Sequence, residues 1–344
     1  MSTAGKESLT AYPLPFDVPI LSSTEAFAFS FFLTAIYVGS LYLSKSSRVF
    51  RQVLSVQSTE KDRVRKELGR NHPDVIRARI KAVMGATFIC VFGIWGLVQY
   101  GSEAHKDPSE ISAVPKIKTL LPTLSLLGFP LAIPASPLPL AELYSTEPGR
   151  LMQAFFWLPS PLVPFMLAPI LFLGPLFTDV GLEGFNPRLA FESLGSIVGI
   201  RNYIVAPLTE EIVFRACTIA IAQLSGASWT HQIFITPLWF GLAHAHHAYD
   251  VFASGGKTMR AFQIALGSSI FQFMYTTVFG WFAAYLFVTT GSILAPLFAH
   301  TFCNIMSLPN PAYAMQRHPD RKFDIIATYI MGVLGFYYLL PKIQ

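Results

Sequence analysis

Residues 207–215 read Pro207-Leu208-Thr209-Glu210-Glu211-Ile212-Val213-Phe214-Arg215 and place two acids and one base inside an apolar stretch, 203–224. Near the centre of a membrane-spanning helix, each ionisable side chain costs on the order of 2.5–3.5 kcal/mol, so charge there indicates function. On a helix, Glu211 and Arg215 are four residues apart and share a face, whereas Glu210 points about 100° away. We therefore expect Glu211 to pair with Arg215 and Glu210 to face elsewhere.

The rest of the chain is also strongly apolar. Of its 344 residues, 52% are hydrophobic and 13% are charged, against about 25% charged in ordinary soluble domains. This composition argues against a soluble protein and predicts an all-α, polytopic integral membrane protein, a bundle of about eight transmembrane helices. The spans are expected in windows with almost no charge: roughly 24–44, 82–100, 151–178, 203–224, 231–249, 262–288, 291–308 and 324–341.

Prolines interrupt two apolar windows. The stretch 118–140 contains five prolines and fits a re-entrant or interfacial segment as well as a full crossing, which gives a count of seven to nine spans. The stretch 155–177 also contains five, so its helix should be short or kinked.

Basic residues are concentrated in one loop. Residues 45–81 hold eleven Lys and Arg against four Asp and Glu, and the whole chain has a net charge of +5. The positive-inside rule places this loop in the cytosol and the N-terminus across the membrane. Within the loop, a break at Asn71-His72-Pro73 should precede a new helix. The net charge thus reflects topology, and no nucleic-acid partner is expected.

The order of these segments predicts one integral-membrane domain with its chemistry in the second half. Residues 1–22 lack the pattern of a signal peptide. The expected divisions are a polar tail at 1–22, an N-terminal transmembrane region at 23–200, a catalytic core at 201–308, and a C-terminal helix and tail at 309–344.

Polar residues suited to catalysis recur in three apolar windows of the second half. Pairs four residues apart share a helix face, so these faces can line one polar, water-filled cavity inside the bilayer. A carboxylate with a histidine can take a proton from water, and a histidine with an asparagine can donate hydrogen bonds to an oxyanion. The pattern predicts hydrolysis without a covalent nucleophile, a metal or a cofactor. The residues are Glu210, Glu211 and Arg215, then Phe240, His244, His246 and His247, then His300 and Asn304.

Three other chemistries remain open. Glu210, His244 and His300 could form a three-ligand zinc site across helices, although the string His-Glu-x-x-His is absent. Cys217 or Cys303 could serve as a nucleophile, although free cysteine is often simply buried. The charged cavity could also belong to a carrier or binding protein that cuts nothing. The three cysteines, the third being Cys90, show no spacing typical of disulfides.

Three motifs resemble those of the glutamic intramembrane protease family that includes the CAAX prenyl endopeptidases. They are Glu-Glu-x-x-x-Arg from Glu210, Phe-x-x-x-His from Phe240 and His-x-x-x-Asn from His300, in this order and in apolar windows. The resemblance is specific over about 201–308. Similarity to the eukaryotic Ras-converting branch extends to residues 71–76, 206–209, 243–247 and 271–276.

The resemblance implies a protein of the endoplasmic reticulum membrane, with an active site reached from the cytosol. It implies removal of the last three residues from prenylated CAAX proteins such as Ras- and Rho-type GTPases. By the same resemblance, Glu210 and His244 activate water, and His300 and Asn304 hold the oxyanion. The implied supporting residues are Glu211, Arg215 and Phe240.

Overall fold

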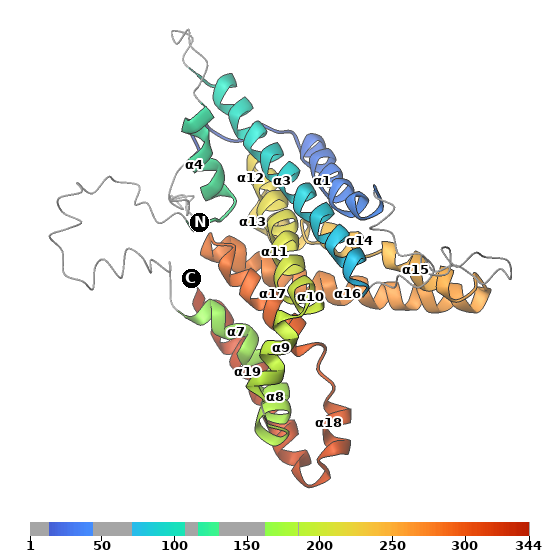
Figure 1. Ribbon diagram of the computed structural model, residues 1–344. Coiled ribbons are helices and arrows are strands. Elements are labelled where there is room, and N and C mark those ends of the chain that lie inside the picture. The colour runs from blue at the N-terminus through green and yellow to red at the C-terminus, as the bar shows by residue number, and fades with distance from the viewer. Residues whose placement is uncertain (1–13, 44–70, 107–115, 131–161, 185, 344) are drawn as a thin grey trace, which may run out of the picture. The chain divides into compact units, whose positions relative to one another are not determined.

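The computed structural model describes residues 14–43, 71–106, 116–130, 162–184 and 186–343, and every regular element among them is a helix (Figure 1). Four segments of this part of the chain are long and apolar enough to cross a membrane, and a bent pair of helices makes a possible fifth. The all-α, multi-spanning membrane class is confirmed. The number of eight spans stays a prediction.

Four of the predicted windows coincide with long helices. These are α1 (Ser23–Leu43), α3 (Pro73–Ala104), α16 (Met259–Thr290) and α19 (Lys322–Leu339). The start of α3 at Pro73 confirms the predicted break in the basic loop. The rest of that loop, residues 131–140 of the proline-rich window and residues 151–161 of the next window lie outside the described residues.

The prediction that the helix in the window 155–177 is short or kinked is confirmed for its described part. Helix α7 (Val163–Leu171) is followed by α8 (Leu173–Leu176) and η1 (Phe177–Leu182), and the two arms are bent by 68°. Pro169 and Pro175 lie on either side of the bend. Each lacks the N–H that would bond the carbonyl four residues earlier, so the helix cannot continue straight.

The window 203–224 lies in an unbroken but irregular helical run. It comprises α10 (Ile197–Gly199), η2 (Ile200–Val205), α11 (Ala206–Glu211), η3 (Ile212–Cys217) and α12 (Thr218–Leu224), where η2 and η3 are wider π-type turns. Pro207 cannot donate to the carbonyl of Tyr203, which accounts for the first wide turn.

A single span over 231–249 is not what the structure has, and that expectation is wrong. Three short helices replace it: α13 (Trp229–Phe234), α14 (Leu238–Ala243) and α15 (His246–Ser254). Pro237 separates the first two because it cannot join the preceding hydrogen-bond ladder. In the window 291–308, α17 (Leu294–Met306) has 13 residues. Its length of about 20 Å is short of the roughly 30 Å hydrocarbon core.

The chain forms two compact units. The α11 unit comprises residues 18–94 and 190–284, and the α17 unit comprises residues 1–17, 95–189 and 285–344. Both units contain parts of the long helices α3 and α16. The expected catalytic core at 201–308 therefore draws on both, and its boundaries stay a prediction.

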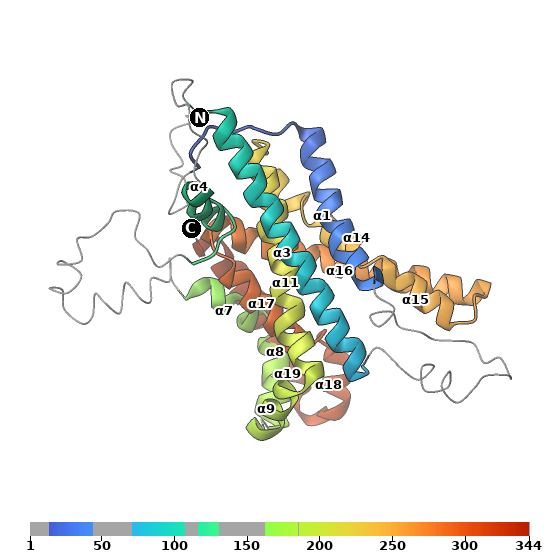
Figure 2. The ribbon, with the colours of Figure 1, turned by 45° about the horizontal axis from the view of Figure 1, so that its top comes forward.

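In the α11 unit, helix α1 packs on α12 and α14, and α1, α3 and α11 lie side by side (Figures 1 and 2). A capping box begins α1: the Ser22 N–H donates to Glu25 Oε2 at 2.8 Å, and the Glu25 N–H donates to Ser22 Oγ at 3.3 Å. The N–H of Ile20 donates to the carbonyl of Leu224 at 2.9 Å, which joins the start of α1 to the end of α12.

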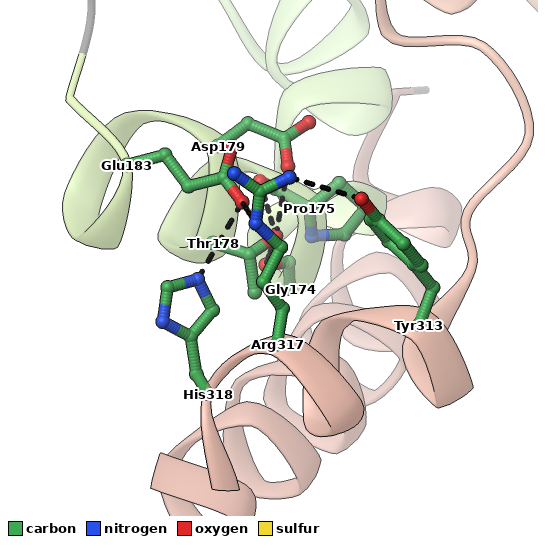
Figure 3. Close-up of polar contacts among 8 residues, drawn as sticks. All are labelled: Gly174, Pro175, Thr178, Asp179, Glu183, Tyr313, Arg317 and His318. Carbon is green, nitrogen blue, oxygen red and sulfur yellow. Dashed lines mark hydrogen bonds and ion pairs between the residues drawn. The ribbon is translucent and has the colours of Figure 1, made fainter.

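In the α17 unit, α7 and α8 pack against α19 (Figure 2). At the end of the bent pair, Glu183 contacts an arginine and a histidine from the segment around α18 (Pro311–Arg317), as Figure 3 shows. Arg317 Nε lies 3.3 Å and His318 Nε2 3.5 Å from Glu183 Oε1. Arg317 Nη1 also donates to the hydroxyl of Tyr313 at 2.9 Å. These contacts connect η1 to α18.

Glycines permit the close approach of α19 to α7 and α8. A Cβ atom at Gly332 would lie 2.7 Å from the carbonyl oxygen of Ile170 and 3.1 Å from that of Leu171. Gly174 likewise faces the ring of Tyr329 without room for a side chain. Small residues of this kind let helix backbones pack closely in membranes.

We expect Gly332→Ala to destabilise the α17 unit by about 1–3 kcal/mol, because backbone oxygens cannot yield to the added methyl group. Thermal unfolding in detergent measures the change. Gly96→Ala in α3 is the matched control, since a Cβ there meets nothing within 4 Å. Equal melting temperatures for the two variants would contradict the close packing.

Candidate active site

A cavity of about 120 Å³ lies within the α11 unit, bounded by α1, α3, the run from η2 to η3, and the α14–α15 segment. One water needs roughly 10–15 Å³ of such space, so several fit. The cavity combines apolar walls with acidic, basic and imidazole side chains. Its polar lining residues are Tyr37, Arg79, Arg201, Glu210, His244, His246 and His247.

The two glutamates of the stretch 207–215 face different surroundings, as the helix geometry predicts. Glu210 lines the cavity and is partly exposed. Glu211 and Arg215 are fully buried, and Arg215 Nη1 lies 3.2 Å from Glu211 Oε1. The expected pairing of Glu211 with Arg215 is confirmed, and a charge of one sign offsets the other inside the unit.

Aromatic rings cover the buried pair. The guanidinium carbon of Arg215 lies 4.2 Å from the centroid of Phe240 and 5.4 Å from that of Phe279. Such contacts stabilise a desolvated cation through the electron-rich ring face. The rings of Phe240 and His244 also form a T-shaped contact, with centroids 4.7 Å apart and planes at 82°. Phe240 thus connects the buried pair to the cavity.

The backbone sets the tautomer of His244. Its Nδ1 lies 2.8 Å from the carbonyl oxygen of Phe240, one turn earlier on α14. A carbonyl only accepts, so Nδ1 carries the proton of the neutral ring, and Nε2 keeps the lone pair. His244 therefore presents a basic nitrogen, and it lines the same cavity as the carboxylate of Glu210.

Tyr37 of α1 is a site residue that the sequence did not reveal. Its hydroxyl lies 2.8 Å from Thr209 Oγ1, and Thr209 in turn donates to the carbonyl of Val205 at 2.8 Å. Since Thr209 uses its one hydrogen on the helix, Tyr37 donates to Thr209. This bond holds α1 against the residue that directly precedes Glu210. Nothing in the window 24–44 distinguishes this tyrosine from the other hydroxyl-bearing residues there, among them Thr34 and Tyr42.

Four more residues line the cavity: the predicted polar residues His246 and His247, and Arg79 and Arg201, for which the sequence predicted no role. The rings of His246 and His247 have centroids 4.0 Å apart and planes tilted by 42°, and His246 Nδ1 lies 2.6 Å from the carbonyl oxygen of Ala243. Arg79 comes from α3 and Arg201 from η2. They add two positive charges to a cavity that holds one carboxylate among its lining residues.

His300 and Asn304 lie four residues apart on α17, in the α17 unit. His300 is buried and Asn304 is partly buried. Phe302 packs edge-on against Phe172 with centroids 5.7 Å apart, which fixes α17 against the bent pair. The two residues and the cavity of the α11 unit belong to different units, so their joint action stays a prediction.

Within the described ranges, no three His, Cys, Asp or Glu side chains form a group that could hold a metal ion. Cys217 is buried and Cys303 partly buried. Fold and site thus define a class: an all-helical, multi-spanning membrane protein with a carboxylate and an imidazole on one cavity among its helices.

Comparison with known proteins identifies the family. A family model described as type II CAAX prenyl endopeptidase Rce1-like matches residues 192–306. The chain is 32% identical over 330 residues to human CAAX prenyl protease 2, covering 90% of this chain and 78% of that protein. It is 30% identical over 320 residues to the probable CAAX prenyl protease 2 of Schizosaccharomyces pombe, covering 91% and 92%. No solved structure matches the chain.

This chain belongs to the Rce1-like family of CAAX prenyl endopeptidases, and it is a membrane protease. The matched range 192–306 contains all seven residues that the sequence motifs single out for catalysis or its support, from Glu210 to Asn304.

Proposed function

We propose that this protein removes the C-terminal tripeptide from prenylated CAAX proteins, Ras- and Rho-type small GTPases among them, in the membrane of the endoplasmic reticulum. The observation that carries the proposal is the placement of two groups, the carboxylate of Glu210 and the imidazole of His244, on one cavity that has room for several waters. The names of the relatives, CAAX prenyl proteases, support the substrate class.

Water is the nucleophile in this mechanism. Glu210, with His244, takes a proton from a water molecule in the cavity as its oxygen attacks the carbonyl carbon of the prenylated cysteine. His300 and Asn304 donate hydrogen bonds to the oxyanion of the tetrahedral intermediate. The carbon–nitrogen bond then breaks, and the proton held by the base passes to the leaving amine. Glu211, Arg215 and Phe240 hold the side chains of Glu210 and His244 in place.

A site among membrane helices suits a lipidated substrate. A prenyl chain prefers the bilayer, and α1, α3 and α16 expose large apolar side chains, including Phe31, Phe92 and Ile270, toward their surroundings. We propose that the prenyl group arrives from the bilayer while the cleaved bond meets water in the cavity. The basic loop at 45–81 supports entry of the peptide from the cytosol.

The proposal is tested with membranes that contain the protein, a prenylated CAAX peptide and its unprenylated twin. Mass spectrometry follows release of the C-terminal tripeptide. We expect release from the prenylated peptide and much less from the twin. Release from neither peptide would favour a carrier or binding protein with a charged cavity.

His300→Ala and Asn304→Ala are each expected to lower turnover by about 10²–10³, since loss of one oxyanion donor typically has this effect. Initial rates and substrate affinity are measured together. Cys303→Ala, one residue before Asn304 on α17, is the matched control and should keep its turnover because no thiol acts. Loss of affinity alone would mark His300 or Asn304 as a substrate contact, and an inactive, folded Cys303→Ala protein would support a thiol nucleophile.

Strong chelators should leave the turnover of the purified enzyme intact, because the proposed base is a carboxylate–imidazole pair acting directly on water. A catalytic zinc ion is normally lost on chelation, with loss of activity. The measurement is the initial rate before and after chelation, with zinc added back. Inactivation that zinc reverses would instead support a zinc site at Glu210, His244 and His300.

A further inference from the structure

Two arginines share the cavity with the candidate base. Arg79 projects from the first part of α3 and Arg201 from η2, and both line the space that Glu210 and His244 line. A protease needs no cation to activate water with a carboxylate, so the proposed reaction leaves these two guanidinium groups without a role. Both side chains are partly buried. Removing a charged group from water costs free energy, so a charge in such a place is a candidate for a functional role.

Arg201 is held in a defined orientation. Its Nη2 donates to Asn71 Oδ1 at 3.0 Å, and its Nε donates to Asn202 Oδ1 at 2.8 Å. Both of these acceptors are side-chain amides, and the two bonds orient the guanidinium. An oriented guanidinium is the group that proteins most often use to bind a carboxylate through two parallel hydrogen bonds.

The spacing along the helix matches the length of the released product. Arg201 precedes Glu210 by nine residues in one helical run, which corresponds to at most about 13 Å along the axis. A tripeptide in extended form spans about 10–11 Å. A substrate whose scissile carbonyl lies at Glu210 can thus bring its terminal carboxylate within reach of Arg201.

We propose that Arg79 and Arg201 bind the free C-terminal carboxylate of the substrate and so determine that cleavage occurs three residues from the chain end. The inference rests on the proposed function and adds to it a recognition site for the end of the chain. Asn71 is a positioning residue in this site, since it acts through Arg201.

The test compares a prenylated CAAX peptide with its C-terminal amide, which lacks the negative charge but keeps every side chain. Wild-type protein should cleave the acid at least about tenfold more efficiently, as judged by kcat/KM, because a hydrogen bond to a charged group is lost in the amide. Arg79→Gln and Arg201→Gln should each bring the ratio of acid to amide toward one, chiefly through KM. Arg201→Lys should keep part of the preference.

Arg77→Gln is the matched control. Arg77 lies on α3, is exposed, pairs with Asp74 at 2.9 Å and does not line the cavity. This variant should keep the wild-type ratio of acid to amide. The ratio of acid to amide cleavage is measured on the wild-type protein itself. The inference therefore remains testable even if an arginine variant fails to fold.

Equal cleavage of acid and amide by the wild-type protein would overturn the carboxylate site while leaving the proposed function intact. An equal loss of both activities in the arginine variants would also overturn it, and would assign these residues to structure or to lipid headgroups. Cleavage of neither peptide by the wild-type protein would overturn the proposed function, and this inference with it.

Discussion

Glu210→Gln is expected to fold and insert like the wild-type protein and to lose about 10²–10⁴ in turnover, the usual contribution of a general base. Glutamine keeps the shape and hydrogen bonding of the side chain but does not accept a proton from water. Glu210 lines the cavity and is partly exposed, so we expect the loss of its charge to affect folding less than the loss of the fully buried Glu211.

The measurements are the initial rate on a prenylated CAAX peptide and the melting temperature in the same detergent. A stable Glu210→Gln protein that keeps more than about a tenth of the wild-type rate would exclude Glu210 as the base. Activity would then have to be assigned to His244 or to another group on the cavity.

Glu211→Gln should fail in a different way, through stability. Glu211 and Arg215 have no exposed side-chain surface, and their charged atoms lie 3.2 Å apart. Removal of one partner from a buried ion pair leaves the other charge uncompensated and costs about 3–5 kcal/mol. We expect lower accumulation in membranes and a lower melting temperature, with a weakened activity that follows from the loss of folded protein.

The double change Glu211→Gln with Arg215→Gln should regain part of the stability that Glu211→Gln loses, since it removes the uncompensated charge. Thermal unfolding of the single and double variants gives the coupling between the two sites. If Glu210→Gln is the unstable protein and Glu211→Gln the stable, inactive one, the roles of the two glutamates are reversed.

The long helices could be predicted from hydropathy because their signal is local. Windows of low charge located α1, α3, α16 and α19, and prolines located the bend after α7. The window 231–249 likewise contains no Asp, Glu, Lys or Arg, yet Pro237 divides it into short helices. Hydropathy measures the preference for an apolar environment and carries no information on whether the backbone continues through it.

Within the site, spacing predicted only contacts made along one helix. The pairing of Glu211 with Arg215 and the contact of Phe240 with His244 both follow from a separation of four residues. Tyr37 and Thr209 are 172 residues apart, and the meeting of Arg79 and Arg201 on one cavity depends on how α3 packs. No periodicity in the sequence encodes such contacts between distant helices.

Cleavage in water enriched in ¹⁸O tests the central claim, that Glu210 directs water to the bond three residues from the chain end. Purified protein is incubated with a prenylated CAAX peptide, and the masses of both products are measured by mass spectrometry. We expect an intact, unlabelled tripeptide and one ¹⁸O atom in the new carboxylate of the prenylated cysteine, and neither product at an appreciable rate from Glu210→Gln. Stepwise loss of single residues, label in the tripeptide, or undiminished release by Glu210→Gln would contradict it.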